Sequence, residues 1–258
     1  MSSILDLNQT IPTLGIALSL CAAGTITALS IFETSQLQAS LPKIIQTISI
    51  SISLSAGGGI AALSIFAIPQ LQSQPADRSL PLIRWLFSRG GHIFPQAATI
   101  AMAGFTYLAY DTLPEPTTRS ISQLLKTTNG FKVNAYLTAA VLAMGIAPFT
   151  ILLMIPNNFA IIKKNEMLGG ARSVNAAKVL KESGYKPGQR SAVDSINSLG
   201  EGSELFDLSG PQTKTPISSS EADDREVRRM LGEFGRYNLG RALLVGGAGV
   251  VGLVAALS

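Results

Sequence analysis

The chain carries three short polar clusters, each at the edge of a long apolar block. The first cluster holds Trp85, Arg89 and His92, the second Asn157 and Asn158, and the third Asn238 and Arg241. Together they supply two guanidinium cations, three carboxamides, an imidazole and an indole. A guanidinium stabilises an oxyanion, and carboxamides bind neighbouring oxygen atoms. We therefore expect the clusters to form the mouth of a site for a flat, phenolic and partly apolar ligand.

Structural interpretations also exist for the first and third clusters. Trp85 is typical of an interfacial anchor, and Arg89 and Arg241 are typical of charges that flank a membrane span. His92 is the only histidine of the chain, and a histidine in such a position is more often a boundary residue than a base. An imidazole nevertheless has an ordinary pKa that suits proton transfer near neutral pH. His92 is therefore the candidate base.

The second cluster closes an apolar run that begins near Val133. Pro156 directly precedes the two amides, and proline lacks the backbone N–H that would continue a helix. The pattern predicts that the helix ends here and that Asn157 and Asn158 satisfy its last carbonyl groups. The three clusters converge only if their helix ends reach the same side of a membrane.

Composition predicts such a membrane. Of the 258 residues, 47% are hydrophobic and only 14% are charged, whereas a soluble domain has about 25% charged residues. The net charge of +4 is then best explained by basic residues beside membrane spans. We expect the lipid bilayer as a partner and no nucleic acid. Cys21 is the only cysteine, so an internal disulfide and a cysteine metal cluster are excluded.

Five apolar blocks predict five membrane-spanning helices, since a helix needs roughly 20 residues to cross the hydrocarbon. The blocks are residues 11–32, 44–69, 94–110, 133–155 and 239–257. The first two are related, because the sequence at 28–32 recurs at 62–66 and that at 36–38 recurs at 70–72. Two explanations are open: a tandem duplication of one membrane helix, or a gene model that kept two alternative exons. The predicted fold is an all-α membrane protein, a four-helix transmembrane bundle plus one duplicated N-terminal transmembrane helix.

Two domains follow from this pattern. Residues 1–43 form the duplicated first segment, and residues 44–258 form a four-helix membrane domain with a long, partly disordered loop at about 159–220. Within the loop, 186–219 is rich in Gly, Ser and Pro, which predicts disorder. A short surface helix is expected at 171–182, and Ser220 is expected to cap a helix that runs into the last span.

The charges of the loops predict the orientation. The two most basic loops follow the second and fourth blocks, so they lie on the same side of the membrane. By the positive-inside rule this side is cytosolic, which places the N-terminus and the long loop in the cytosol. Small residues four apart predict close helix packing, at Gly58 with Ala62 and at Ala248 with Gly252 and Ala256.

Several further pieces complete a recognisable pattern. They are Ala-Gly-Gly-Gly-Ile-Ala-Ala-Leu-Ser at 56–64, Trp85 with Arg89-Gly90 and Pro95, Tyr107-Leu108-Ala109-Tyr110, Pro148-Phe149-Thr150, Pro156-Asn157-Asn158, and Asn238 with Arg241. In order and spacing they resemble the anthrone oxygenase-like family of small integral membrane proteins, which is common in fungal polyketide pathways. The resemblance covers Ile44 to the C-terminus without the disordered part of the long loop. The chain departs from the family in its extra first span, in Asn157 where the family tends to have threonine, and in Phe234 where a tryptophan is often found.

The resemblance implies that an aromatic polyketide of the anthrone type is oxidised to an anthraquinone by O2, in an endomembrane, without a metal or an organic cofactor. Arg89 or Arg241 would stabilise the substrate oxyanion, with Asn158 and the candidate base His92 as the other catalytic groups. The expected substrate-binding residues are Trp85, Asn157 and Asn238. The alternative is a non-catalytic multi-pass membrane protein, an assembly or interaction factor. A transporter is a weaker third option, because the apolar blocks contain no acidic residue to couple ions.

Overall fold

The computed structural model describes residues 34–114, 120–126, 128–204 and 206–258. The protein is all-helical, with 76% helix and no strand among these residues, which confirms the predicted fold class. The chain divides into two compact units, Met1–Ile44 and Ile45–Ser258. The predicted span at 11–32 lies outside the described residues, so the duplicated helix and the domain boundary that it implies stay predictions.

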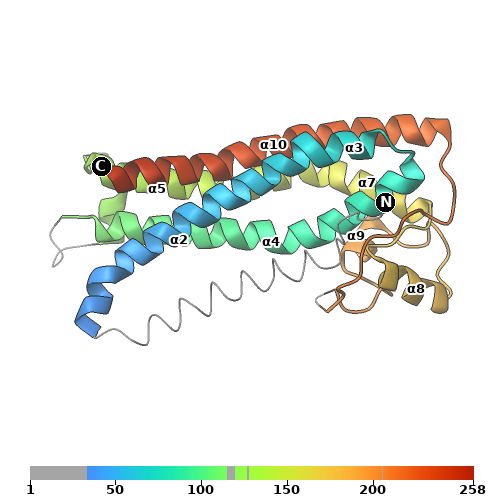
Figure 1. The fold of residues 1–258 in the computed structure, drawn as a ribbon, viewed down its shortest axis with the longest axis horizontal. Coiled ribbons are helices and arrows are strands. Elements are labelled where there is room, and N and C mark those ends of the chain that lie inside the picture. The colour runs from blue at the N-terminus through green and yellow to red at the C-terminus, as the bar shows by residue number, and fades with distance from the viewer. Residues whose placement is uncertain (1–33, 115–119, 127, 205) are drawn as a thin grey trace, which may run out of the picture. The chain divides into compact units, whose positions relative to one another are not determined.

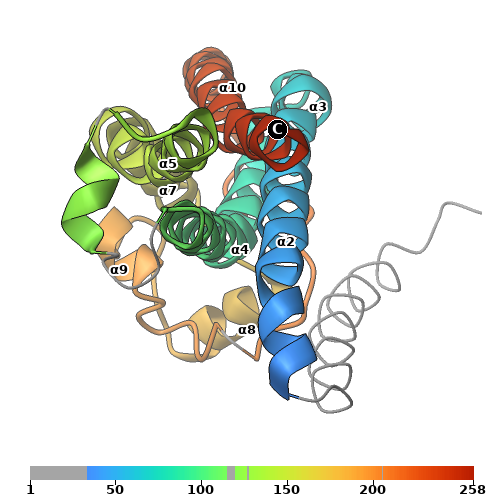
Figure 2. The ribbon, with the colours of Figure 1, turned by 90° about the vertical axis from the view of Figure 1, so that its left-hand side faces the viewer.

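The helices follow one another in a simple order. They are α2 (Thr34–Ala62), η1 (Leu63–Ala67), α3 (Ile68–Gln72), α4 (Ala76–Asp111), η2 (Ile121–Leu125), α5 (Phe131–Met144), α6 (Ile146–Phe149), η3 (Thr150–Met154), α7 (Ile155–Met167), α8 (Val174–Glu182), α9 (Ala192–Ile196) and α10 (Glu221–Leu257). Helix α5 packs against α4 and α10, and α10 also packs against α3 and α7 (Figures 1 and 2).

Within the described part of the chain, three helical stretches are long and apolar enough to cross a membrane. They are Ser40–Gln72, Phe131–Met167 and Glu221–Leu257, and each contains one of the predicted spans. The predicted span at 94–110 lies within α4, which is not in this set. The protein is therefore a membrane protein by the length and composition of three helices, and a fourth span remains a prediction.

The last helix begins where its cap predicts. The Ser220 hydroxyl accepts a hydrogen bond from the Asp223 backbone N–H at 3.2 Å, and the Asp223 carboxylate accepts one from the Ser220 backbone N–H at 2.9 Å. This reciprocal capping box satisfies two backbone donors, and three acidic residues in the first turn complement the helix dipole. Helix α10 then continues unbroken to Leu257.

The predicted helix end at Pro156 is wrong. The chain continues as α7 to Met167, and Pro156 lies at the beginning of that helix, directly after the π-helix η3. The same arrangement occurs at Pro69, which follows the π-helix η1. A proline interrupts the backbone hydrogen bonds of the preceding turn and its ring crowds a carbonyl group. The wider π-turn shifts that carbonyl, so the helix bends around the proline instead of ending.

At membrane level the helices approach closely through small residues. A Cβ atom on Gly57 would lie 2.6 Å from the Gly246 Cα atom, so α2 and α10 touch backbone to backbone. Gly252 is equally confined against the Phe105 ring, as the predicted Ala248–Gly252 spacing requires. The other predicted packing residue, Gly58, is exposed and has no neighbour within 4 Å of such a Cβ. Its neighbour Gly57 makes the contact, because α2 presents the adjacent face to α10.

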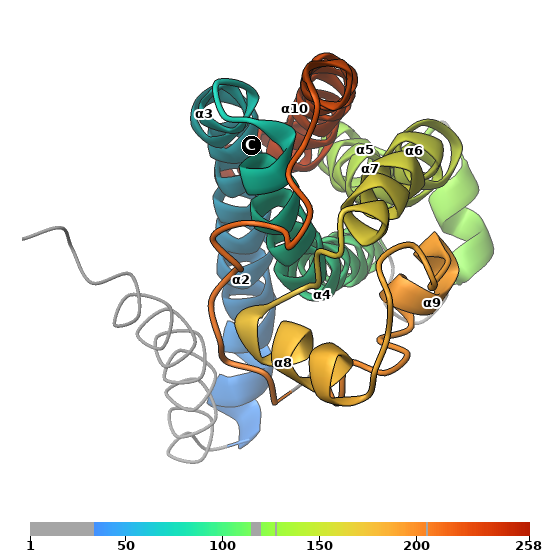
Figure 3. The same cartoon turned by 90° about the vertical axis from the view of Figure 1, so that its right-hand side faces the viewer.

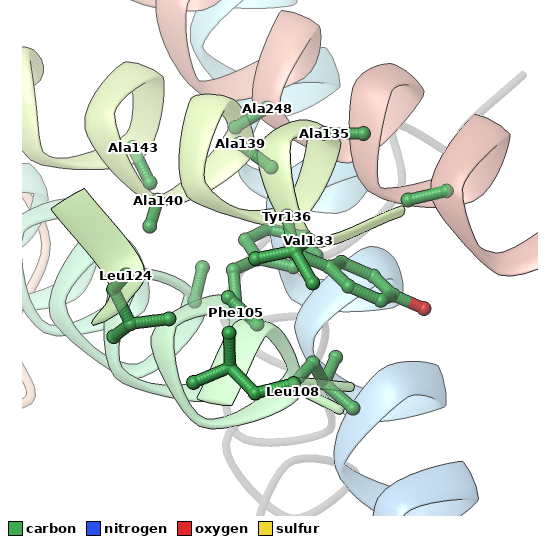
Figure 4. Close-up of a cluster of buried hydrophobic side chains, with 14 residues drawn as sticks. Phe105, Leu108, Leu124, Val133, Ala135, Tyr136, Ala139, Ala140, Ala143 and Ala248 are labelled. Carbon is green, nitrogen blue, oxygen red and sulfur yellow. The ribbon is translucent and has the colours of Figure 1, made fainter. Parts of the chain in front are cut away.

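The core between α4, α5 and α10 is small and largely built from alanine. Figure 4 shows Tyr136 and Phe105 among Ala139, Ala140 and Ala248. The Phe105 and Tyr136 rings stack with centroids 6.4 Å apart, and the Tyr136 hydroxyl donates to Gln46 Oε1 at 2.9 Å. Alanine brings helix backbones together, and the two rings fill the remaining space.

Residues 168–219, here called the cap, are folded where the sequence predicted disorder over 186–219. Short helices α8 and α9 lie in this segment, at the end of the structure where α3, α7 and the first turns of α4 lie (Figures 1 and 3). Arg190 anchors the cap, because its guanidinium contacts Glu166 Oε1 at 2.5 Å and Glu201 Oε1 at 2.8 Å. The Gly, Ser and Pro content supplies turns, and the buried charges supply the order that composition alone did not predict.

Candidate active site

A cavity of about 510 Å³ lies between the bundle and the cap. Its volume is within the usual range for small-molecule sites. Helix α4 contributes one wall from Arg84 to Pro95, and both π-helices contribute through Leu63 and Thr150. The cap contributes Ile196 and Glu204. Both prolines with their π-turns thus shape the cavity, in agreement with the frequent occurrence of π-turns at functional sites.

Four of the seven residues predicted for the site line this cavity. His92 comes from α4, Asn158 from α7, and Asn238 and Arg241 from α10. The convergence of the three sequence clusters on one end of the bundle is therefore present in the structure. Because these side chains come from three separate helices, the packing of α4, α7 and α10 determines their geometry.

The other three predicted residues hold the framework and do not line the cavity. Trp85 donates its indole N–H to the Ser209 carbonyl at 3.0 Å, and the Arg89 guanidinium lies 5.6 Å from the Trp85 ring centroid and donates to the Asp207 carbonyl. Asn157 donates to the Met230 carbonyl at 3.0 Å and so ties α7 to α10. These contacts place the three side chains among the supports of the site.

One face of α4 carries the cap. Arg84, Trp85, Ser88 and Arg89 lie at positions i, i+1, i+4 and i+5, so they project from neighbouring turns on one side. All four donate hydrogen bonds to residues of the cap. Arg84 is buried and donates to the Ser195 carbonyl at 2.7 Å. Burial lowers its pKa against the opposing charges of Glu201 and Glu204.

Arg241 and Asn158 line the cavity, and each has one buried side-chain atom without a hydrogen-bond partner among the described residues. Arg241 donates through Nη1 to Asn238 Oδ1 at 3.1 Å, and Asn238 donates to the Ile60 carbonyl at 3.2 Å. The Nε atom of Arg241 and the Oδ1 atom of Asn158 are buried and have no partner among the described residues. Buried polar atoms are nearly always paired. An unpartnered donor and an unpartnered acceptor thus lie on two side chains that line one cavity.

His92 meets a carboxylate that the sequence did not predict. Its Nε2 atom lies 3.5 Å from Glu204 Oε1, and Glu204 also accepts a hydrogen bond from Ser88. Burial alone would raise the pKa of Glu204, but the Ser88 hydrogen bond and the charge of Arg84 bring it below its ordinary value. Glu204 is thus an anion that can orient the imidazole.

Sequence reasoning missed Glu204 and Arg84 for different reasons. Glu204 lies in the segment predicted to be disordered, and Arg84 is one of several basic residues in the loop after the second apolar block. A usable signal was present, because 166–207 contains both acidic and basic residues that can pair. Among the described residues, no group of three or more His, Cys, Asp or Glu side chains could hold a metal ion.

The fold and the cavity define an all-helical membrane protein with a largely apolar cavity, lined by a few polar side chains, where its helices meet a folded cap. The family model of anthrone oxygenases matches residues 84–251, more than half of the chain, so the protein belongs to the anthrone oxygenase family. This confirms the predicted resemblance. The match begins at Arg84, later than the expected Ile44, and runs through the cap. No curated protein and no solved structure matches the chain.

Proposed function

We propose that the protein oxidises an anthrone-type polyketide to an anthraquinone with O2 and that the 510 Å³ cavity is the substrate site. Family membership supports an oxygenase-type function. The observation that carries the proposal is the pair of unpartnered buried atoms, Arg241 Nε and Asn158 Oδ1. A deprotonated anthrone has an anionic oxygen for the guanidinium, and a neighbouring phenolic hydroxyl is a donor for the amide oxygen.

The reaction starts with a proton transfer. A base removes a proton from the ring carbon opposite the carbonyl group, and the charge spreads into an aromatic phenolate. This electron-rich carbon reacts with O2, which oxidises it: the carbon loses its two hydrogens and gains one oxygen, and the second oxygen leaves as water. The anthrone supplies the electrons, so the proposal involves neither a metal nor an organic cofactor.

Each cavity residue has a role in this scheme. Arg241 stabilises the phenolate as the proton leaves, and Asn238 holds the guanidinium in place. His92 takes the proton, with Glu204 as the positioning residue. More than half of the His92 side-chain surface is exposed, at 57%, so the imidazole can pass the proton to water. Trp85, Arg89 and Asn157 act indirectly, since they hold the cap and α7 in position.

Substitution of the two unpartnered groups tests the proposal. Membranes containing the full chain are incubated with emodin anthrone in air, and quinone formation is measured above the spontaneous rate. Arg241→Lys and Asn158→Ala should each lower the rate at least about tenfold, which corresponds to ~1.4 kcal/mol of transition-state stabilisation. The matched controls Arg78→Lys and Asn175→Ala change exposed side chains and should retain the rate.

The outcomes separate the alternatives. Wild-type membranes that form quinone no faster than the spontaneous reaction would favour a non-catalytic membrane protein. Full activity in both variants, at unchanged membrane abundance, would remove Arg241 and Asn158 from the mechanism. The pH–rate profile of His92→Ala tests the base: loss of the limb that reports its deprotonation is expected, and an unchanged profile assigns ionisation to the arginine and amide groups alone.

We further propose that the N-terminus and the cap face the cytosol and that the membrane is an endomembrane. The basic residues of the loops support this orientation. Epitope tags at the two termini test it in sealed microsomes. A protease added outside should remove the N-terminal tag, and protection of that tag would reverse the orientation.

A further inference from the structure

A groove of about 640 Å³ lies between the end of α3 and the first half of α10, away from the catalytic cavity. Its lining residues are Gln72, Arg225, Arg228, Arg229, Gly232 and Arg236. The arginines are exposed, whereas Phe234 and Asn238 on the buried face of the same helix line the catalytic cavity. The family relationship and the proposed reaction give this groove no role.

The spacing of the arginines makes one continuous strip. Arg225, Arg229, Gly232 and Arg236 lie at i, i+4, i+7 and i+11, which is one face of a helix. The strip is about 16 Å long at ~1.5 Å per residue. Gly232 has no side chain, so the middle of the strip is open, and a Cβ there would lie 3.0 Å from Gln72 Nε2. The groove therefore has an arginine side chain at each end and no side chain at Gly232 in its middle.

The walls of the groove are fixed by a reciprocal pair of hydrogen bonds. Gln72 Nε2 donates to the Arg228 carbonyl at 2.9 Å, and Arg228 Nε donates to the Gln72 carbonyl at 3.0 Å. These bonds join α3 to α10 without using the terminal nitrogens of the Arg228 guanidinium. The groove is thus built before any ligand arrives, which lowers the entropic cost of binding.

The local charge is positive after internal pairing. Arg225 lies 3.7 Å from Glu221 and Arg229 lies 2.7 Å from Glu233, each an i,i+4 pair. Exposed pairs of this kind are weak and exchange readily with other anions. Two carboxylates against four arginines leave the groove with an excess of two positive charges. A phosphate group accepts paired N–H donors from arginine, so it fits these side chains.

The position along the helix places the groove at the surface of the bilayer. The apolar part of α10 begins at Leu239, three residues or ~4.5 Å beyond Arg236. On the other wall, the exposed side chain of Phe66 precedes Gln72 by six residues, about 9 Å. Both walls therefore change from apolar to polar at the same end, next to the groove. Basic residues at this depth attract anionic lipids.

We infer that this groove binds the phosphorylated headgroup of an anionic phospholipid. The volume exceeds the needs of a lone phosphate ion, and the ~16 Å strip suits a headgroup that projects from the membrane with more than one anionic group. The lipid would bridge α3 and α10 beside their Gln72–Arg228 contact. It would thereby stabilise the helix that carries Asn238 and Arg241.

Native mass spectrometry of the detergent-purified full chain tests the inference. The protein is mixed with phosphatidylinositol 4-phosphate, phosphatidylserine or phosphatidylcholine, and the retained lipid is measured. The phosphoinositide should be retained most strongly. Arg225→Gln combined with Arg236→Gln should lower its retention about tenfold, equal to ~1.4 kcal/mol. Neither side chain takes part in the Gln72–Arg228 bonds, so this variant should fold. The control is Lys178→Gln with Lys181→Gln on the exposed face of α8.

Three results would overturn the inference. Equal retention of phosphatidylcholine would show that the groove does not select charge, and unchanged retention in the Arg225/Arg236 variant would place the lipid elsewhere. Competition by inorganic phosphate or free inositol phosphate as strong as by the lipid would make it a soluble-anion site. Preferential binding of polyglutamate would identify an acidic protein segment as the occupant. None of these measurements uses quinone formation, so they stand apart from the test of the oxygenase.

Discussion

The membrane-level bundle and the cap are held together by opposite means. In the bundle, Gly57 and Gly246 bring two backbones into contact, and the core consists mostly of alanine around two aromatic rings. In the cap, Arg190 bridges Glu166 and Glu201 in a buried ion cluster. Small residues pack well in lipid, where there is no hydrophobic drive between helices. A short segment outside the bilayer has too few apolar residues for a core and relies on paired charges instead.

The candidate active site lies where the two regions meet and takes one feature from each. The bundle supplies Arg241 and Asn158 on rigid helices, and the cap supplies Glu204 opposite His92. If this division is correct, damage to one region should leave the other folded. Substitutions confined to one region can test that separation.

Substitution of Gly57 should damage the bundle most. In Gly57→Leu the new side chain meets the Gly246 backbone, which cannot move aside without parting α2 from α10. We expect a loss of about 3 kcal/mol or more in the free energy of unfolding, measured by helix loss during denaturation in detergent. Gly58→Leu is the matched control, because nothing lies within 4 Å of a Cβ there, and it should change stability by less than about 0.5 kcal/mol. Equal effects of both variants would contradict the observed helix contact.

Removal of the Arg190 charge should open the cap. Arg190→Met leaves Glu166 buried without its cation and leaves Glu201 with only Arg172, at 3.8 Å, at a cost of about 3–5 kcal/mol. Hydrogen exchange should rise across 168–219 while the amides of α5 stay protected. The control Lys178→Gln removes an exposed pair with Glu182 at 3.9 Å, worth only ~0.3–0.5 kcal/mol. Exchange that rises equally in α5 would show that the two regions fold as one unit.

Acid should loosen the cap to a smaller extent. Burial opposes ionisation of Glu204 and Asp207, but hydrogen bonds from Ser88 and Ser173 hold the pKa of each below its ordinary value. A lowered folded-state pKa contributes stability above the ordinary carboxyl pKa, and this contribution is lost as the pH falls through the folded value. Exchange of the cap should therefore rise below about pH 4.

The bundle provides the internal reference for this acid effect, because residues 45–62, 133–155 and 239–257 contain no acidic residue. Its exchange should not respond over the same pH range. In Glu204→Gln the acid response of the cap should become shallower. An acid response of equal size in the bundle would rule out these carboxylates as the cause.

Structural features that depend on residues close in sequence were predicted correctly. Features that depend on contacts between distant residues were not. The cap of α10 at Ser220 was predictable because a capping box involves residues three apart. The choice between Gly57 and Gly58 was not, since both lie in a run of three glycines and only the position of α10 distinguishes them. The folded cap was missed for the same reason. Arg190 and Glu166 are 24 residues apart, and composition does not show that they pair.

The polar clusters illustrate the same limit within the site. Three of the helices that meet at the cavity were predicted to end or begin there, and four of the seven residues do line it. Which residue of a neighbouring pair faces inward depends on helix rotation. Asn158 faces the cavity and Asn157 faces Met230, and no feature of the sequence distinguishes the two amides.

The π-turn η3 sets the rotation of α7 around its own axis. A π-turn accommodates one residue more than the α-helical turn that it replaces, and one residue corresponds to about 100° of rotation around the helix axis. All residues from Ile155 onward are therefore rotated by about 100° from the positions that an uninterrupted α-helix would give them. An α-helical turn with the same number of residues would rotate α7 by that angle and exchange the two amides, whereas deletion of one residue between Thr150 and Met154 would remove the π-turn and leave Asn158 facing the cavity. The proposed chemistry therefore depends on an angle as much as on a side chain.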